Sequence, residues 1–202
     1  FTKNKLRKIL KSENVDAIVI AGDIVHSKVH GVTPELISSL TWWFRSMCEI
    51  CDVYVTLGNH DGLILNKFRE DAITPVIKAL NIDNLHLFKD SGVYDSHMPD
   101  VKFCVLSCFD SDYDIVKPVP GCINIGIYHG SVKGSKTDSG WELPGEIDIN
   151  ILEQYDLTML GDIHKMQYLN ERKSIAYCGS TIQQNYGESP DKGVLILGNR
   201  RC

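Results

Sequence analysis

Four short stretches of the chain combine glycine with aspartate, asparagine or histidine, residue types that can bind a metal ion. They are Gly22-Asp23, Gly58-Asn59-His60-Asp61, His129-Gly130 and Gly161-Asp162-Ile163-His164. Carboxylate and amide oxygens together with imidazole nitrogens form a ligand set that suits Mn²⁺, iron or Zn²⁺. Glycines beside them let the backbone turn sharply and bring these side chains close to one point. The sequence therefore predicts a metal centre assembled from several separate stretches.

Each stretch follows an apolar segment that is typical of a strand. We expect strands at residues 15–21, 53–57, 123–128 and 157–160, the first of them a buried parallel strand. Ligands of open α/β sheets collect beyond the carboxyl ends of the strands. The side chains named above are therefore expected to meet at one edge of the fold.

The remaining pattern alternates helices and strands early in the chain and contains mostly strands later. A helix is expected at residues 1–11, and another begins at Thr33-Pro34, where Thr33 can cap it and Pro34 fits its first turn. A third is expected at residues 68–80, interrupted near Pro75. Further segments are a short helix at 149–154 and strands at 85–88, 101–107, 175–177 and 194–197. This order predicts a layered α/β (α+β) sandwich.

Composition sets limits on the class of protein. The chain has 202 residues, of which 43% are hydrophobic and 23% charged, so it can form a packed core. Its apolar runs are too short to cross a bilayer, so we expect no membrane association. The formal net charge of −5 argues against a protein that coats DNA by electrostatics alone. It does not exclude a nuclease, because bound divalent metals supply positive charge where phosphate must lie.

The seven cysteines are interpreted as structural. Cys48 and Cys51 form a CxxC pair, but no second pair stands nearby to complete a zinc site. Reduced thiols and the lack of a signal peptide indicate a cytoplasmic or otherwise intracellular location, the nucleus if the source is eukaryotic. Three histidines outside the strand-end pattern, His30, His86 and His97, are interpreted as surface or loop residues without ligand partners.

The order of the strand-end motifs resembles the calcineurin-like metallophosphoesterases, over nearly the whole chain. The variant with His26 three residues after Asp23, in Gly22-Asp23-Ile24-Val25-His26-Ser27, looks like the Mre11/SbcD DNA-repair nucleases. Later motifs are similar to the same branch, namely Gly161-Asp162-Ile163-His164-Lys165, Tyr177-Cys178-Gly179-Ser180-Thr181 and Tyr186-Gly187-Glu188.

The resemblance implies two metal sites, occupied by Mn²⁺, with Mg²⁺ or iron as alternatives. Asp23 would bridge both metals, Asn59 and His129 would bind the second, and His164 the first. His60 would protonate or stabilise the leaving oxygen.

For two neighbours of these residues, the resemblance implies supporting roles in catalysis. Asp61 would orient His60, and His26 would contact the phosphate. The chemistry is that of metals which polarise a phosphoryl group and of a side chain that protonates the leaving oxygen.

Two departures from the family pattern affect the metal sites. Asp162 stands where the first histidine of a Gly-His-x-His motif is usual, and it either ligates through oxygen or faces water. The opening Asp-x-His motif is absent. We therefore expect residues 1–202 to be a single phosphoesterase domain that is a fragment, lacking a first strand and a C-terminal capping domain. Such a chain would hold one metal well and the other poorly.

Three functions remain open at this point. The first is a metal-dependent nuclease that hydrolyses DNA phosphodiester bonds as exonuclease or endonuclease, a subunit of a repair or recombination complex. By resemblance its partners would be DNA, an SMC-like coiled-coil ATPase of the Rad50/SbcC type and a second copy of itself. The second is a phosphatase acting on proteins or small phosphoesters. The third is a catalytically inactive scaffold, against which the retained His60 argues.

Overall fold

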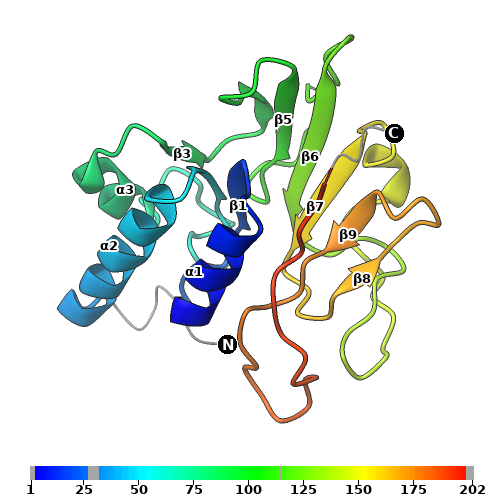
Figure 1. Ribbon diagram of the computed structural model, residues 1–202. Helices are drawn as coiled ribbons and strands as arrows, with labels where there is room; N and C mark the ends of the chain where they lie inside the picture. Colours follow the sequence, from blue (N-terminus) through cyan, green and yellow to red (C-terminus); the bar gives the residue numbers. More distant parts are fainter. Residues whose placement is uncertain (1–2, 27–31, 114, 199–202) are drawn as a thin grey trace.

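Two β-sheets face one another in the structure, a computed structural model that describes residues 3–26, 32–113 and 115–198 (Figure 1). The first sheet is fully parallel, with the order β1-β2-β3, and comprises Ala17–Ala21, Asp52–Thr56 and Leu85–Phe88. All three strands are short and rich in apolar residues, as expected for strands covered on both faces.

The second sheet has the order β4-β5-β6-β7-β9-β8. In that order, its strands are Gly92–Asp95, Val101–Leu106, Ile123–His129, Leu157–Gly161, Ile175–Tyr177 and Gln167–Tyr168. The central strands β5, β6, β7 and β9 are parallel, and the two edge strands are antiparallel to their neighbours. The carboxyl ends of β6 and β7 therefore lie at the same edge of this sheet.

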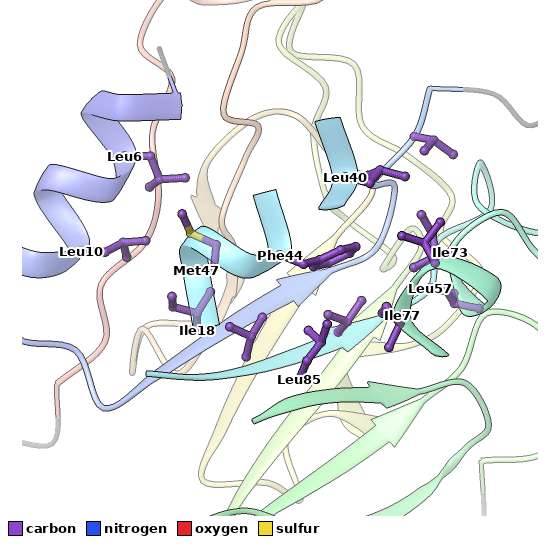
Figure 2. Close-up of a cluster of buried hydrophobic side chains, with 14 residues drawn as sticks. Leu6, Leu10, Ile18, Leu40, Phe44, Met47, Leu57, Ile73, Ile77 and Leu85 are labelled. Atoms are coloured by element: carbon purple, nitrogen blue, oxygen red, sulfur yellow. The ribbon is translucent and has the colours of Figure 1, made fainter. Parts of the chain in front are cut away.

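Helices cover the outer face of the first sheet (Figures 1 and 2). They are α1 (Lys3–Ser12), α2 (Pro34–Cys48) and α3 (Thr74–Leu80). Their apolar faces pack on the sheet in one core cluster, in which Phe44 and Met47 are fully buried. The Thr33 side chain accepts a hydrogen bond from the N–H of Leu36, as predicted for the start of α2.

A second apolar layer joins the two sheets. Strand β5 directs Phe103 and Val105 toward the first sheet, where they meet Tyr54 and Phe88. The alternate residues of the second sheet, among them Tyr128, form a separate cluster on its other face. A 3₁₀ helix at Ile149–Ile151 lies against that cluster. The predicted mixed α/β sandwich is thereby confirmed.

Several predicted elements were wrong in extent. Helix α3 begins at Thr74, so Pro75 occupies its first turn rather than interrupting it, and Phe68 lies outside it with 92% of its surface exposed. Residues 194–197 form no strand, and the short helix expected at 149–154 is a single 3₁₀ turn. Strands β4 and β8 were not predicted because each is short and half exposed. Within the described part of the chain, no helix combines the length and apolarity needed to span a membrane.

Candidate metal centre

Four of the side chains predicted to bind metal lie where four parallel strands end. Asp23 follows β1, Asn59 follows β2, His129 is the last residue of β6, and Asp162 follows β7 directly. Contacts of β1 with both β6 and β7 bring the two sheets together at this edge. These four residues are called the His129 cluster below.

The side chain of His129 is the centre of the cluster. Its Nε2 atom lies 3.2 Å from Asp23 Oδ1, 3.4 Å from Asn59 Oδ1 and 3.9 Å from Asp162 Oδ1. One ligand atom each from Asp23, His129 and Asp162 can be chosen so that all lie within 4.8 Å of one another. The structure therefore places the four side chains around one point.

The orientation of the His129 ring follows from its other nitrogen. His129 Nδ1 lies 2.7 Å from the carbonyl oxygen of Ala21. A carbonyl oxygen only accepts hydrogen bonds, so Nδ1 carries the proton and donates it. In the neutral ring Nε2 then presents a lone pair to three oxygen atoms, an arrangement that needs a proton or a metal cation between them.

Three glycines make room for the His129 ring. A Cβ added at Gly22 would lie 2.3 Å from Nδ1, one at Gly58 would lie 2.7 Å from Cε1, and one at Gly161 would lie 2.8 Å from Nδ1. Each glycine directly precedes one of the other cluster residues in the sequence. The Gly-Asp and Gly-Asn pairs therefore serve to let a buried imidazole approach three backbones at once.

Two cluster residues adopt backbone conformations that non-glycine residues rarely take. The φ angle of Asp23 is +53° and that of Asp162 is +86°. Residues held in such conformations cost free energy, on the order of 1–3 kcal/mol each, and concentrate at functional sites. Both aspartates are thus held at the site despite an unfavourable backbone conformation.

The electrostatics of the cluster show an excess of negative charge. Burial raises the pKa of Asp162; His129 counteracts this, but the charges of Asp23 and Glu146 raise it further. Burial would also raise the pKa of Asp23, yet the hydrogen bond and charge of His129 leave it lowered. Burial would lower the pKa of His129, and its contacts with Asp23 raise it instead. A divalent cation would satisfy both carboxylates, so the donor set fits a metal.

A cavity of about 310 Å³ opens beside the cluster. Asn59, His129 and Asp162 line it together with Tyr128 and Glu146, and no lysine or arginine is among its described lining residues. The Tyr128 hydroxyl donates to Glu146 Oε2 at 2.9 Å. Sequence reasoning missed Glu146, because it lies in a loop without any motif and reaches the site only through folding.

His60 and His26 lie together next to the cluster. Their rings stack with centroids 5.7 Å apart. The His60 backbone N–H donates to Asp23 Oδ1 at 3.0 Å, and His60 Nε2 lies 4.0 Å from Asp23 Oδ2. His60 Nδ1 contacts the carbonyl oxygen of His26. The exposed His60 ring thus presents Nε2 at the cluster.

Asp61 does not contact His60 in the way that we predicted. Its fully buried carboxylate accepts backbone N–H groups from Ile24 (2.9 Å), Val25 (3.0 Å) and Gly58 (2.8 Å). Burial raises its pKa to about 6, although the Gly58 and Val25 hydrogen bonds act in the opposite direction. Asp61 therefore joins the loop after β1 to the loop after β2, the two loops that carry Asp23 and Asn59.

His164 lies apart from the metal-ligand group formed by Asp23, His129 and Asp162. Its Nδ1 atom lies 2.8 Å from Oε1 of Glu188, and its ring lines a separate cavity of about 370 Å³ with Lys192. Burial would raise the pKa of Glu188, but hydrogen bonds from His164 and Lys192 lower it to about 2. The structure thus brings together four of the five predicted metal ligands and holds the fifth by a different contact.

Two of the histidines outside the strand-end pattern make hydrogen bonds within the chain. His86 Nε2 donates to Asp52 Oδ1 at 2.9 Å, and the Tyr54 hydroxyl is 2.9 Å from His97 Nδ1. His86 is the register partner of Tyr54 across β2 and β3, a relation that the sequence does not show. His30 lies outside the described residues.

The chain is similar to known proteins over most of its length. A family model described as calcineurin-like phosphoesterase matches residues 1–174. "Uncharacterized protein R555" of Acanthamoeba polyphaga mimivirus is 39% identical over 197 residues, which cover 90% of this chain and 14% of that protein. "Putative phosphoesterase 244L" of Invertebrate iridescent virus 6 is 27% identical over 202 residues, covering 92% of this chain and 65% of that protein. The chain spans less than two thirds of the length of either relative.

Proposed function

The chain belongs to the calcineurin-like phosphoesterase family, a family of metal-dependent phosphoester hydrolases, and on this premise we propose that it hydrolyses DNA phosphodiester bonds. The observation that carries the hydrolase assignment is the convergence of three oxygen ligands on Nε2 of His129. The narrower assignment, to the Mre11/SbcD nuclease branch, rests on the Asp23-x-x-His26 motif and on the stacking of His26 with His60.

The His129 cluster would hold the metal, for which we propose Mn²⁺. Asp23 and Asp162 supply charge, Asn59 supplies a neutral oxygen, and His129 supplies a nitrogen whose tautomer is fixed by Ala21. A divalent cation bound there supplies Lewis-acid polarisation of the phosphoryl group. With its carboxylate retained at the cluster, Asp162 is assigned as a ligand rather than as a residue that merely faces water.

The two exposed histidines would act on the substrate. His60 donates through Nδ1 to the His26 carbonyl, which leaves Nε2 as the atom that can hold a proton for the leaving oxygen. The His26 ring, which stacks on the His60 ring, would contact a phosphate oxygen. Asp61 supports both by holding the backbone of the loop after β1.

A comparison of three substrates tests this function. With Mn²⁺ present, we expect hydrolysis of linear duplex DNA and of bis(p-nitrophenyl) phosphate, and little hydrolysis of p-nitrophenyl phosphate. An Asn59→Ala variant should lose the activity, because it removes a ligand without changing charge. Hydrolysis of the monoester alone would contradict the nuclease assignment. Inactivity on all three with Mn²⁺, Mg²⁺ and Fe²⁺ would favour a scaffold.

A phosphatase for small phosphoesters is the second candidate. The cavity beside the cluster favours it, because Asp110 and Glu146 line the cavity and no described lysine or arginine does. Such a lining attracts a polyanionic duplex poorly. The same three-substrate comparison separates the two candidates.

The proposed partners besides DNA are an SMC-like coiled-coil ATPase and a second copy of the chain, both by resemblance to the Mre11/SbcD branch. Leu65 and Phe68, with 95% and 92% of their surface exposed, support an apolar contact with another protein. Light scattering of the purified chain should give the mass of a dimer, and a Phe68→Ser variant should shift it to that of a monomer. A parent chain that stays monomeric would contradict the dimer.

A further inference from the structure

Glu188 is a buried carboxylate that contacts the predicted metal ligand His164 from a distant part of the chain. Only 6% of its side chain is exposed, and its Oε1 atom lies 2.8 Å from His164 Nδ1. The two residues are 24 positions apart. The family model ends at residue 174, before Glu188, so the match does not extend to this contact.

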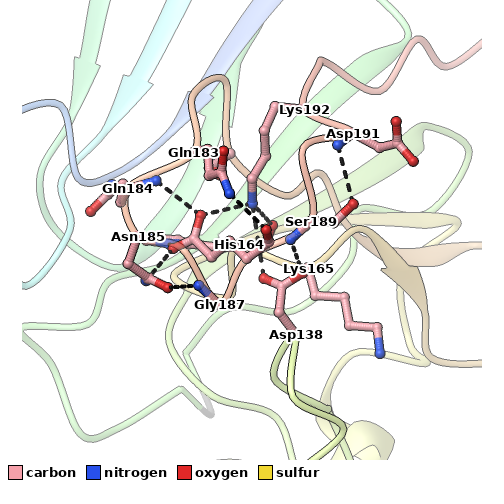
Figure 3. Close-up of polar contacts among 12 residues, drawn as sticks. Asp138, His164, Lys165, Gln183, Gln184, Asn185, Gly187, Ser189, Asp191 and Lys192 are labelled. Atoms are coloured by element: carbon pink, nitrogen blue, oxygen red, sulfur yellow. Dashed lines mark hydrogen bonds and ion pairs between the residues drawn. The ribbon is translucent and has the colours of Figure 1, made fainter.

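Every side of the Glu188 carboxylate has a partner. Oε1 also accepts from Asn185 Nδ2 at 2.9 Å, and Oε2 accepts from Lys192 Nζ at 2.9 Å and from the N–H of Gln184 at 3.1 Å. Lys192 in turn donates to the carbonyl oxygen of His164 at 3.1 Å, so the segment holds both the side chain and the backbone of His164 (Figure 3). These hydrogen bonds hold the buried carboxylate in one position and keep it ionised.

The chemistry of the contact determines the state of His164. An ionised carboxylate only accepts hydrogen bonds, so His164 Nδ1 carries a proton and Nε2 is left with a lone pair. His129 is arranged in the same way by the carbonyl oxygen of Ala21. Histidines that bind metal ions usually donate their other ring N–H to a carboxylate or carbonyl, which fixes both tautomer and ring orientation.

We propose that Glu188 is a positioning residue, which holds His164 with Nε2 free to bind a metal ion and so makes segment 184–192 part of the metal centre. The inference rests on the proposed function, because that function makes His164 a ligand. A purely structural role would tie down the same segment without any requirement on the tautomer of His164.

The tautomer of His164 provides the first test, and it needs no metal. Long-range ¹H–¹⁵N NMR of the ¹⁵N-labelled chain distinguishes a protonated Nδ1 from a protonated Nε2. We expect protonated Nδ1 in the parent and in Glu188→Gln, whose amide oxygen still accepts, and a shift toward protonated Nε2 in Glu188→Ala. Asp191→Ala removes a carboxylate from the same segment but not from His164, so it should match the parent. An unchanged tautomer in Glu188→Ala overturns the proposal.

Calorimetric titration with Mn²⁺ provides the second test. His164→Ala defines the binding that depends on this ligand, and Glu188→Ala should weaken that same binding about 10- to 100-fold. Glu188→Gln should weaken it less, and Asp191→Ala should not change it. Parent-like Mn²⁺ binding by Glu188→Ala overturns the proposal even if the tautomer shifts. If His164→Ala itself binds Mn²⁺ like the parent, the assignment of His164 as a ligand fails. The tautomer experiment then still shows whether Glu188 fixes the protonation of the His164 ring, so the two failures are distinguishable.

Discussion

Two polar clusters lie at opposite ends of strand β2, and they are built in opposite ways. At the carboxyl end, the His129 cluster gathers oxygen acceptors around one nitrogen and holds two aspartates at positive φ. At the amino end, the Tyr54 cluster (Asp52, Tyr54, His86 and His97) pairs each donor with an acceptor. Tyr54 stacks on His86 with centroids 4.7 Å apart, and its hydroxyl accepts from the His97 N–H at 2.9 Å.

The difference distinguishes a candidate functional site from a cluster that stabilises the fold. The Tyr54 cluster is complete as it stands, since its hydrogen bonds are made within the chain and none of its residues has a positive φ angle among those described. The His129 cluster, in contrast, needs a proton or a metal cation between Nε2 and the three oxygen atoms. Groups that are strained and short of partners mark functional sites, whereas satisfied groups contribute to stability. Mutations in the two clusters should therefore affect different measurements.

The largest effect is expected from Gly161→Ala. The added Cβ would lie 1.9 Å from the Ala21 carbonyl oxygen and 2.8 Å from His129 Nδ1, so the backbone must shift and the ring must move. We expect a loss of about 1–3 kcal/mol in the free energy of unfolding. Mn²⁺ affinity should also fall about 100-fold or more, since the displaced ring belongs to a predicted metal ligand. Urea unfolding and calorimetry measure the two effects.

Gly193→Ala is the matched control for that substitution. Nothing lies within 4 Å of a Cβ at Gly193, so both stability and Mn²⁺ affinity should stay close to those of the parent. Parent-like Mn²⁺ binding by Gly161→Ala would show that the space which Gly161 leaves for the His129 ring is not required for metal binding.

A smaller effect, confined to the metal, is expected from Asp162→Asn. Asparagine keeps the size of the side chain and tolerates positive φ, but it removes one of the negative charges around Nε2 of His129. Mn²⁺ should bind about 100-fold more weakly. Because burial and nearby charges raise the pKa of Asp162, its ionised form costs stability, so the variant in EDTA should unfold no more easily than the parent.

Asp83→Asn makes the same chemical change at an exposed site and should alter neither measurement. A loss of stability in Asp162→Asn with unchanged Mn²⁺ affinity would show that Asp162 has a structural role, like the residues of the Tyr54 cluster.

The opposite pattern is expected from Tyr54→Phe. Tyr54 is 1% exposed, and loss of its hydroxyl leaves the His97 N–H and Nδ1 without their partner. We expect the free energy of unfolding to fall by about 1–2 kcal/mol while Mn²⁺ affinity is unchanged. Tyr94→Phe serves as the control, since its hydroxyl donates to the Asp90 carbonyl at the surface. A change in Mn²⁺ binding in Tyr54→Phe would mean that the two ends of β2 are coupled.

The sequence predicted the His129 cluster because strand ends and glycines are local signals. Asp23, Asn59 and Asp162 each follow a glycine just after a strand, and parallel strands bring such positions together. The Tyr54 cluster depends on the register of β2 against β3, which no local pattern encodes. The partner of His164 was missed for a similar reason, because Glu188 reaches it from a loop 24 residues further along the chain.

The role predicted for Asp61 was an implication of the family resemblance, and in the structure its carboxylate has other partners. His60 is its neighbour in sequence, but folding brings the amides of Ile24 and Val25 to its carboxylate. A buried carboxylate needs hydrogen-bond donors, and the folded loops determine which backbone N–H groups lie close enough to donate. The sequence alone does not show which groups these are.

A pH-dependent effect no larger than that of Tyr54→Phe is expected at Asp71, a buried carboxylate outside both clusters whose oxygens are hydrogen-bonded within the chain. Only 2% of its side chain is exposed. It accepts from the N–H groups of Ile73 (3.0 Å) and Thr74 (2.6 Å) and from Lys89 Nζ at 2.9 Å. Burial would raise its pKa, but the hydrogen bonds from Thr74 and Lys89 leave it lowered.

A lowered pKa in the folded state means that Asp71 contributes stability above the pKa of an unfolded aspartate, about 3.9, and loses that contribution as the pH falls through the folded value. The parent should exceed Asp71→Asn in free energy of unfolding by about 1–2 kcal/mol at pH 7, with the difference shrinking below about pH 4. Urea unfolding of both proteins between pH 3 and 7 in EDTA measures it, and the subtraction removes the other carboxylates. A difference that stays constant down to pH 3 would show that the Asp71 hydrogen bonds do not depend on its charge, and the contrast between satisfied and unsatisfied carboxylates would then lose its electrostatic basis.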